Sequence, residues 1–186
     1  ASRGQPELAR LGRSFVTFET MSVDSYAFLP RAFRAMYEVA PQLDHEPVWA
    51  EFDKPLEEAT IGLLSSAGIF VEGEQAGFDV ERERQEPTWG DPTLRVIQSD
   101  VAQADIGATH LHIRTDDLLA DVDVALPINR LNELAAEGWI GASAKEHFSV
   151  MGFQAEGAEV WRTTTGPEIA ARCHAAEIDA LILAPA

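Results

Sequence analysis

Several features that define large protein classes are scarce or missing in this sequence. Only one of its 186 residues is a cysteine, Cys173, so the chain has neither an internal disulfide framework nor a C-x-x-C site of its own. No apolar run approaches the roughly 20 residues that a membrane-spanning helix needs. A signal-peptide pattern is also missing, and we therefore expect the protein in the cytoplasm.

Basic residues are few. The chain has 14 Lys and Arg against 31 Asp and Glu, which gives a formal net charge of −17. Such a charge repels nucleic acids and anionic membranes, so we expect neither as a partner. The acidic excess is typical of a solubilising surface; a functional acidic patch and a halotolerant or high-GC bacterial source are the alternatives.

The motifs that identify common ligand sites are missing too. The sequence has no G-x-G-x-x-G fingerprint, no phosphate loop, no zinc-finger spacing and no arrangement that resembles a Ser-His-Asp triad. What it has is the length of one domain, enough to bury about 70% of its unfolded surface, and an ordinary hydrophobic content of 46%.

The chain divides by pattern into two parts. Residues 1–58 form an N-terminal lead-in and connector, with a helix predicted in 22–40 that begins beside Pro30 and an extended, proline-rich stretch after it. Residues 59–186 form an α/β domain, and a C-terminal continuation would follow position 186.

Within the second part, strand and helix patterns alternate. This alternation predicts a three-layer α/β fold, with a mostly parallel sheet and helices on both faces. Ile61–Leu64, His110–Ile113 and Leu181–Leu183 are expected to be neighbouring strands of one sheet. The other predicted elements are strands at 94–97 and 146–153, helices at 128–138 and 166–178, a polar loop at 77–93 and an acidic loop at 115–127.

The stretch "ATIGLLSSAGIF" (59–70) runs from an apolar strand into a turn of small residues. Ser65, Ser66 and Gly68 are the predicted ligand-binding residues, because small side chains let a ligand approach backbone N–H groups closely. A plain strand-to-turn connection without a ligand is the alternative.

Two histidines carry the clearest chemical signal. Strand alternation would place His110 and His112 on one side of "ATHLHIR", close enough to share a substrate anion or a Zn or Fe ion. A metal would need a third ligand, such as His147 or an acidic residue of the following loop; histidines bonded to neighbouring backbone are the alternative. Cys173, in the middle of the predicted helix 166–178, is expected to be a packing residue rather than a nucleophile.

Several ordered blocks resemble the selenoprotein B family of glycine, sarcosine and betaine reductases, which is related to D-proline reductase. They are "ATIGLLSSAGIFVEGEQAGFDV", "GDPTLRVIQSDV", "THLHIRTDD" and "DVDVALPINRLNELAAEGWIGASAKEHFSVMGF". The resemblance runs from about residue 56 to the end. In the family, the strand similar to "DALILAPA" (179–186) is followed directly by a redox-active selenocysteine or cysteine.

The resemblance implies a reductase that acts on a small organic substrate, through a Cys or Sec centre beyond residue 186. His110 and His112 would be catalytic residues facing that centre. A thiol-reductant protein or partner subunit, in a homo- or hetero-oligomer, would complete the system. Two alternatives are a non-catalytic subunit or binding module, and a metal-dependent lyase or hydrolase centred on the two histidines.

Overall fold

The computed structural model describes residues 29–31, 34, 50–154 and 158–186. The architecture below is that of the compact unit Glu51–Ala186. The helix predicted in 22–40 lies almost wholly outside the described residues, apart from one helical turn in which the N–H of Arg34 donates to the carbonyl of Pro30 at 3.0 Å.

The main sheet is built around β1 (Thr60–Ser65), the apolar strand of the first resemblance block. On one side β1 pairs in parallel with β7 (Ala180–Ala184). On its other side it pairs in parallel with the two-residue β5 (Ala142–Ser143) and with β6 (Glu146–Ser149). The edge strand β3 (Arg95–Gln98) is antiparallel to β6.

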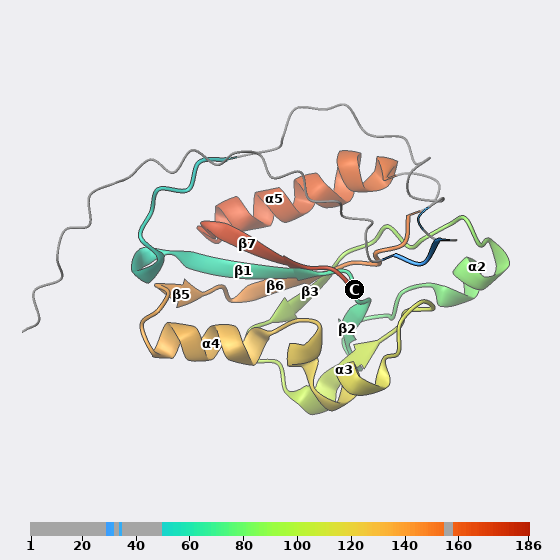
Figure 1. Ribbon diagram of the computed structural model, residues 1–186, viewed down its shortest axis with the longest axis horizontal. Helices are drawn as coiled ribbons and strands as arrows, with labels where there is room; N and C mark the ends of the chain where they lie inside the picture. Colours follow the sequence, from blue (N-terminus) through green and yellow to red (C-terminus); the bar gives the residue numbers. More distant parts are fainter. Residues whose placement is uncertain (1–28, 32–33, 35–49, 155–157) are drawn as a thin grey trace, which may run out of the picture. The chain divides into compact units, whose positions relative to one another are not determined.

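Helices cover both faces of this sheet (Figure 1). Helix α5 (Gly166–Ala175), which carries Pro in its first turn, lies on one face. Helices α4 (Ile128–Ala136) and α3 (Asp116–Ala120) lie on the other. The predicted α/β class with a mostly parallel sheet is confirmed, and so is the pairing of the predicted strands in β1 and β7.

The strand predicted across residues 108–114 is wrong. Strand β4 (Ile106–Ala108) ends where that prediction begins, and it pairs antiparallel with β2 (Ile69–Val71) in a separate two-stranded sheet. Residues 109–115 that follow are bends and irregular backbone. His110–Ile113 is therefore not a neighbour of β1 in the main sheet.

The two predicted loops contain short helices. Helix α2 (Val80–Gln85) lies in the first, and its N-cap Asp79 accepts a hydrogen bond from the N–H of Arg82 at 3.0 Å. The second contains α3. The remaining short helical segments are η1 (Leu56–Glu58), η2 (Gln103–Asp105), η3 (Val122–Val124) and the π-helical η4 (Trp161–Thr165).

The main apolar core lies between the sheet and the α3–α4 layer. Each fully buried Leu or Ile side chain there contributes about 1.5–3 kcal/mol relative to exposure. The side chains of α5 on the other face are less buried, and none of the residues of α5 is fully buried. Prominent members of the core are Leu63, Leu118, Leu126, Ile128 and Leu131.

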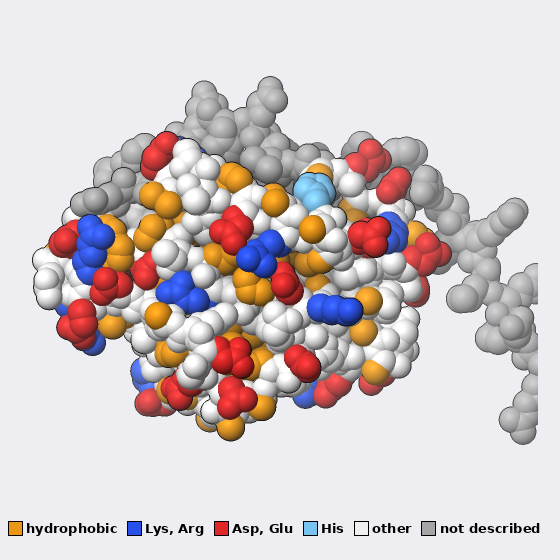
Figure 2. All heavy atoms as spheres, turned by 180° about the vertical axis from the view of Figure 1, so that it is seen from behind, with side chains coloured by type: hydrophobic (Ala, Val, Ile, Leu, Met, Phe, Trp, Pro, Cys, Tyr) orange, Lys and Arg blue, Asp and Glu red, His pale blue; other side chains and the backbone are white. Residues whose placement is uncertain are grey.

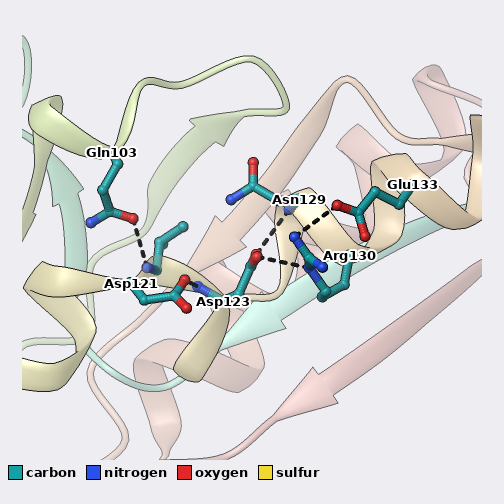
Figure 3. A network of polar contacts seen from close by, with 7 residues as sticks. Gln103, Asp121, Asp123, Asn129, Arg130 and Glu133 are labelled. Carbon is teal, nitrogen blue, oxygen red and sulfur yellow. Dashed lines mark hydrogen bonds and ion pairs between the residues drawn. The ribbon is translucent and has the colours of Figure 1, made fainter.

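Asp123 connects the acidic segment to α4 (Figure 3). Its carboxylate accepts from the N–H of Asn129 at 2.9 Å and from Nε of Arg130 at 3.2 Å. The N-cap residue of α4 is Pro127, which offers no side-chain cap. Asp123 therefore supplies from outside the helix the acceptor that an N-cap side chain usually provides.

The sheet has an irregularity beside β1. The stretch of β1 from Thr60 to Leu64 is matched by a segment two residues longer, from Ala142 to Phe148. At this break the N–H of Leu63 donates to Nδ1 of His147 at 3.2 Å. His147 is completely buried, and burial lowers its pKa from 6.5 to about 4. Its neutral imidazole thus replaces a backbone acceptor within the sheet.

On one face of the molecule the acidic side chains are spread out rather than gathered. In Figure 2, acidic side chains are distributed across one face, with basic side chains among them. Many are paired at short range along a helix, as Arg82 is with Glu86 at 3.1 Å. Exposed pairs of this kind contribute at most about 1 kcal/mol each. On this face the distribution favours the solubilising interpretation of the charge.

Candidate functional site at the carboxyl edge of the sheet

The parallel strands β1, β6 and β7 end at one edge of the main sheet, at Ser65, Ser149 and Ala184. Ligands of open α/β sheets bind outside this carboxyl edge. The chain reaches Ala186 there, and its N–H donates to Oγ of Ser66 at 2.9 Å. The turn after β1 and the segment after β7 therefore meet at the position where such sheets hold their ligands.

The N–H groups of the small-residue turn are already used within the chain. The N–H of Ser66 donates to the carbonyl of Ala184, and that of Ala67 to Oγ of the buried Ser65. Gly68 donates to Val150, and the next N–H also has an acceptor, Oγ of Ser149. Ser65 and Gly68 thus shape the turn, and the half-buried hydroxyl of Ser66 is the group that faces the end of β7.

Gly68 brings the histidine segment against this turn. It has a φ of +66°, and a Cβ at this position would lie 2.1 Å from the carbonyl oxygen of Thr109. The N–H of Thr109 in turn donates to the carbonyl of Gly68 at 3.0 Å. Only glycine allows this close approach, which places residues 109–112 beside the β1 turn although they are not a strand.

His110 and His112 lie close together, but by a bend and not by strand alternation. The N–H of His112 donates to Nδ1 of His110 at 3.1 Å, and the two ring centroids are 5.8 Å apart at an interplanar angle of 82°. Since Nδ1 of His110 is an acceptor, its ring proton is on Nε2. That Nε2 is buried and has no hydrogen-bond partner among the described residues.

A buried carboxylate completes the cluster. Glu83 of α2 is 3% exposed, and its Oε1 lies 3.1 Å from Nε2 of His112. Its Oε2 is buried and has no partner within the described ranges. The ring of Phe153 packs against His112 at a centroid distance of 4.9 Å. No helical pattern is recognisable around Glu83 in the sequence, so its contact with His112 was not predicted.

The electrostatics keep His110 neutral. Burial, with the neighbouring His112 as a second cause, lowers the pKa of His110 below its usual 6.5. A neutral imidazole can donate or accept a proton, as acid–base work requires. His112 is about half exposed at its side chain. The arrangement of a buried carboxylate, an exposed imidazole and a half-buried imidazole is chemically suited to proton transfer.

A hollow of about 280 Å³ lies between the end of β7 and helix α3. Its lining includes Arg114, Asp117, Leu118 and the segment Ala184–Ala186. The guanidinium of Arg114 is exposed and lies 3.8 Å from the carboxylate of Asp117. Neither histidine lines this hollow. The two residues that follow the histidines, Ile113 and Arg114, are the ones that line it.

Metal binding by the histidines has limited support. No group of three or more His, Cys, Asp or Glu side chains in the described part of the chain is arranged to hold a metal ion. The third ligand that the sequence interpretation required is therefore not provided by His147, which is buried in the sheet and bonded to Leu63. Zn or Fe at His110 and His112 stays a prediction.

Cys173 lies in the last part of α5 and is partly buried. Burial raises the pKa of its thiol. A raised pKa keeps the group protonated at neutral pH, where a thiolate would be needed for nucleophilic attack. Its environment is that of a packing residue.

Comparison with curated proteins gives one distant relative. The chain is 28% identical over 146 residues to the D-proline reductase subunit gamma of Acetoanaerobium sticklandii. The chain is a distant homologue of a reductase subunit. The match covers 78% of this chain and 56% of the relative, so the chain spans little more than half the relative's length.

The other comparisons add no family. No family model matches the chain, and no solved structure matches it. None of the helices in the described residues has the length and apolar character to cross a membrane. The reductase relationship thus rests on the one distant relative, and the selenoprotein B resemblance of the sequence blocks stays an expectation.

Proposed function

We propose that this chain is the substrate-binding part of a reductase that acts on a small organic molecule through a cysteine or selenocysteine centre. That centre would lie on residues that follow position 186 or on a partner chain. The observation that carries the proposal is the contact between Ser66 and Ala186, because it brings the end of β7 to the carboxyl edge beside a hollow. The relationship to a reductase subunit supports the same interpretation.

The proposed reaction is reductive cleavage of a C–N bond. The bond breaks, two electrons and two protons are added, the carbon and the nitrogen each gain a hydrogen, and two thiols (or a thiol and a selenol) are oxidised to a disulfide-type pair. The nitrogen leaves more easily when it is protonated, which is general acid catalysis. His112 is the proposed proton donor; Glu83 holds its ring in place, and His110 positions the segment by accepting the N–H of His112 at Nδ1.

Arg114 is the proposed binding residue for a substrate carboxylate. It lines the hollow at the end of β7, and its guanidinium presents a planar donor pair suited to a carboxylate. The relative's name makes D-proline, a small cyclic amino acid, the first substrate to test. A partner subunit or thiol-reductant protein would return the oxidised pair to its reduced form.

The test begins with the gene. Its reading frame is sequenced beyond the codon for Ala186, with an in-frame UGA treated as selenocysteine. The protein it encodes is then incubated with D-proline and dithiothreitol, and the ring-opened amino acid is measured by chromatography. Product that disappears after alkylation with iodoacetate supports the proposal. A frame with no Cys or Sec, together with no product when candidate partner subunits are added, would favour the non-catalytic subunit.

A further inference from the structure

Strand β7 is an edge of the main sheet that has no neighbour on its outer side. Among the described residues it pairs with β1 alone, so about half of its backbone N–H and C=O groups face away from the sheet. Its side chains are uncovered there as well, since Ile182 is 50% exposed and Leu183 is 64% exposed. Successive side chains of a strand point to opposite faces, so cover is missing on both faces of the sheet at this edge.

The other edges of this sheet are protected. At β3, the side chain of Gln75 donates from Nε2 to the carbonyl of Val96 at 2.8 Å and accepts from the N–H of Val71 at 2.9 Å. Strand β5 offers an edge of only two residues. Natural proteins block free edges with charged side chains, proline or short strands. The five residues of β7, "ALILA", include none of these devices, and their continuous apolar pattern is typical of a strand that lies between two neighbours.

The charge of the protein indicates which neighbour fits this edge. With a net charge of −17, two copies repel each other wherever their acidic side chains would meet. The stretch 180–186 has no charged side chain, and Asp179 just before it is already paired with Lys54 at 2.7 Å. A second copy can therefore approach along β7 without burying an unpaired carboxylate. Identical strand edges are self-complementary when they pair antiparallel about a two-fold axis, and closed two-fold dimers are the commonest oligomers.

We propose that the protein forms a two-fold dimer through β7, in which the two copies of this strand pair antiparallel and join the two main sheets into one. When the pair is centred on Ile182, Ala184 of each copy lies opposite Ala180 of the other, and apolar cross-strand pairs cover Ile182 and Leu183. Ala184 also lines the hollow beside α3, so the second copy borders the candidate site. The proposal does not depend on the reductase chemistry.

Analytical ultracentrifugation of the whole protein tests the dimer, and we expect the wild type to dimerise at micromolar concentration. Leu183→Lys and Ile182→Lys place a charge on one or the other face of β7. Each should raise the dissociation constant at least about a hundredfold, because like charges then meet near the two-fold axis. Trp139→Lys is the matched control: this side chain is 66% exposed and lies outside β7, so its replacement should leave the dissociation constant unchanged. Circular dichroism checks that each variant is folded.

Hydrogen exchange of the wild-type protein provides a test that needs no variant. The outward amides of β7 should be protected at concentrations where the dimer forms and should exchange faster after dilution, while the amides of β1 keep their protection. The proposal is overturned if the wild type stays monomeric at high micromolar concentration, or if both β7 variants dimerise as well as Trp139→Lys does. Protection of the β7 amides in a monomer would also overturn it, because the neighbour of β7 would then belong to the same chain.

Discussion

Nε2 of His112 lies 3.1 Å from Oε1 of Glu83, and the two residues differ sharply in exposure. The imidazole is 53% exposed at its side chain and the carboxylate 2%. A buried acceptor that holds one ring nitrogen fixes the orientation of the ring and leaves the other nitrogen free for chemistry. This pair joins α2 to the histidine segment, two parts of the chain that the sequence patterns left unconnected.

If the proposed reaction is correct, the histidine variants should lose activity while they stay folded. His112→Ala should lower turnover about ten- to a thousand-fold, the range of a lost acid–base group, and His110→Ala should lower it about ten- to a hundred-fold because the hydrogen bond that positions His112 is lost. Glu83→Gln should lower it about ten- to a hundred-fold by releasing the ring, and should change the pH profile of kcat. His174→Ala, an exposed histidine of α5, is the matched control. Wild-type turnover in His110→Ala and His112→Ala would return both residues to the backbone-bonded alternative.

Gly68→Ala should destabilise the protein strongly. The residue has a φ of +66°, and the added methyl group would meet the carbonyl oxygen of Thr109. We expect a loss of at least about 2 kcal/mol in the free energy of unfolding, measured by urea denaturation. Gly73→Ala separates the two causes, because Gly73 has a similar φ of +77° and nothing within 4 Å of the added Cβ. Equal losses in the two variants would show that the contact with Thr109 contributes little.

The protein should become less stable as the pH is lowered, because His147 must be neutral in the folded state. Its folded pKa is about 4 and its unfolded pKa is 6.5, so the unfolded state binds the proton first. Stability is therefore fully present above about pH 6.5 and decreases as the pH falls toward 4, by about 3 kcal/mol in total. Urea denaturation between pH 7 and pH 4 measures the slope.

His147→Gln provides the comparison for that slope. Its amide oxygen can accept the N–H of Leu63, and the side chain does not titrate. The variant should show a shallower decrease in stability between pH 6.5 and 4 than the wild type does. The same slope in both proteins would mean that other groups, such as the many carboxylates, account for the acid sensitivity.

Cys173→Ser should leave activity intact and change stability only modestly. The thiol is partly buried in α5, and burial raises its pKa, so iodoacetate should react with it slowly at pH 7 in the native protein. Loss of turnover in a folded Cys173→Ser protein would make this residue the nucleophile and would remove the need for a redox centre elsewhere.

The sequence predicted the elements whose patterns are strong. The apolar runs of β1 and β7 and the proline at the start of α5 gave clear signals. Helix α2 was predicted as a loop, because "VERERQ" contains only one apolar residue and therefore shows no helical periodicity. Glu83 meets His112, a residue 29 positions further along the chain, and no local pattern encodes that contact.

For the candidate site, the closeness of His110 and His112 was predicted but the conformation of their segment was not, because that conformation depends on a long-range contact. Alternation over 108–114 is too short to distinguish a strand from a bend. The backbone contact between Gly68 and Thr109 decides the conformation, and it joins residues 41 positions apart. His110 and His112 are adjacent as expected, but the cause is this long-range contact and the hydrogen bond between them.

The irregularity between β1 and the β5–β6 segment has a consequence for how this fold tolerates change. Its two extra residues are an even number, and side chains of a strand alternate with a period of two. The register between β1 and the β5–β6 segment therefore changes by two residues at this point, and every side chain stays on the same face of the sheet. A change of one residue between Ser143 and Phe148 would instead exchange the two faces of β6, so that the buried His147 and Phe148 would each point to the opposite side of the sheet. Insertions and deletions in pairs are therefore the ones this position can absorb.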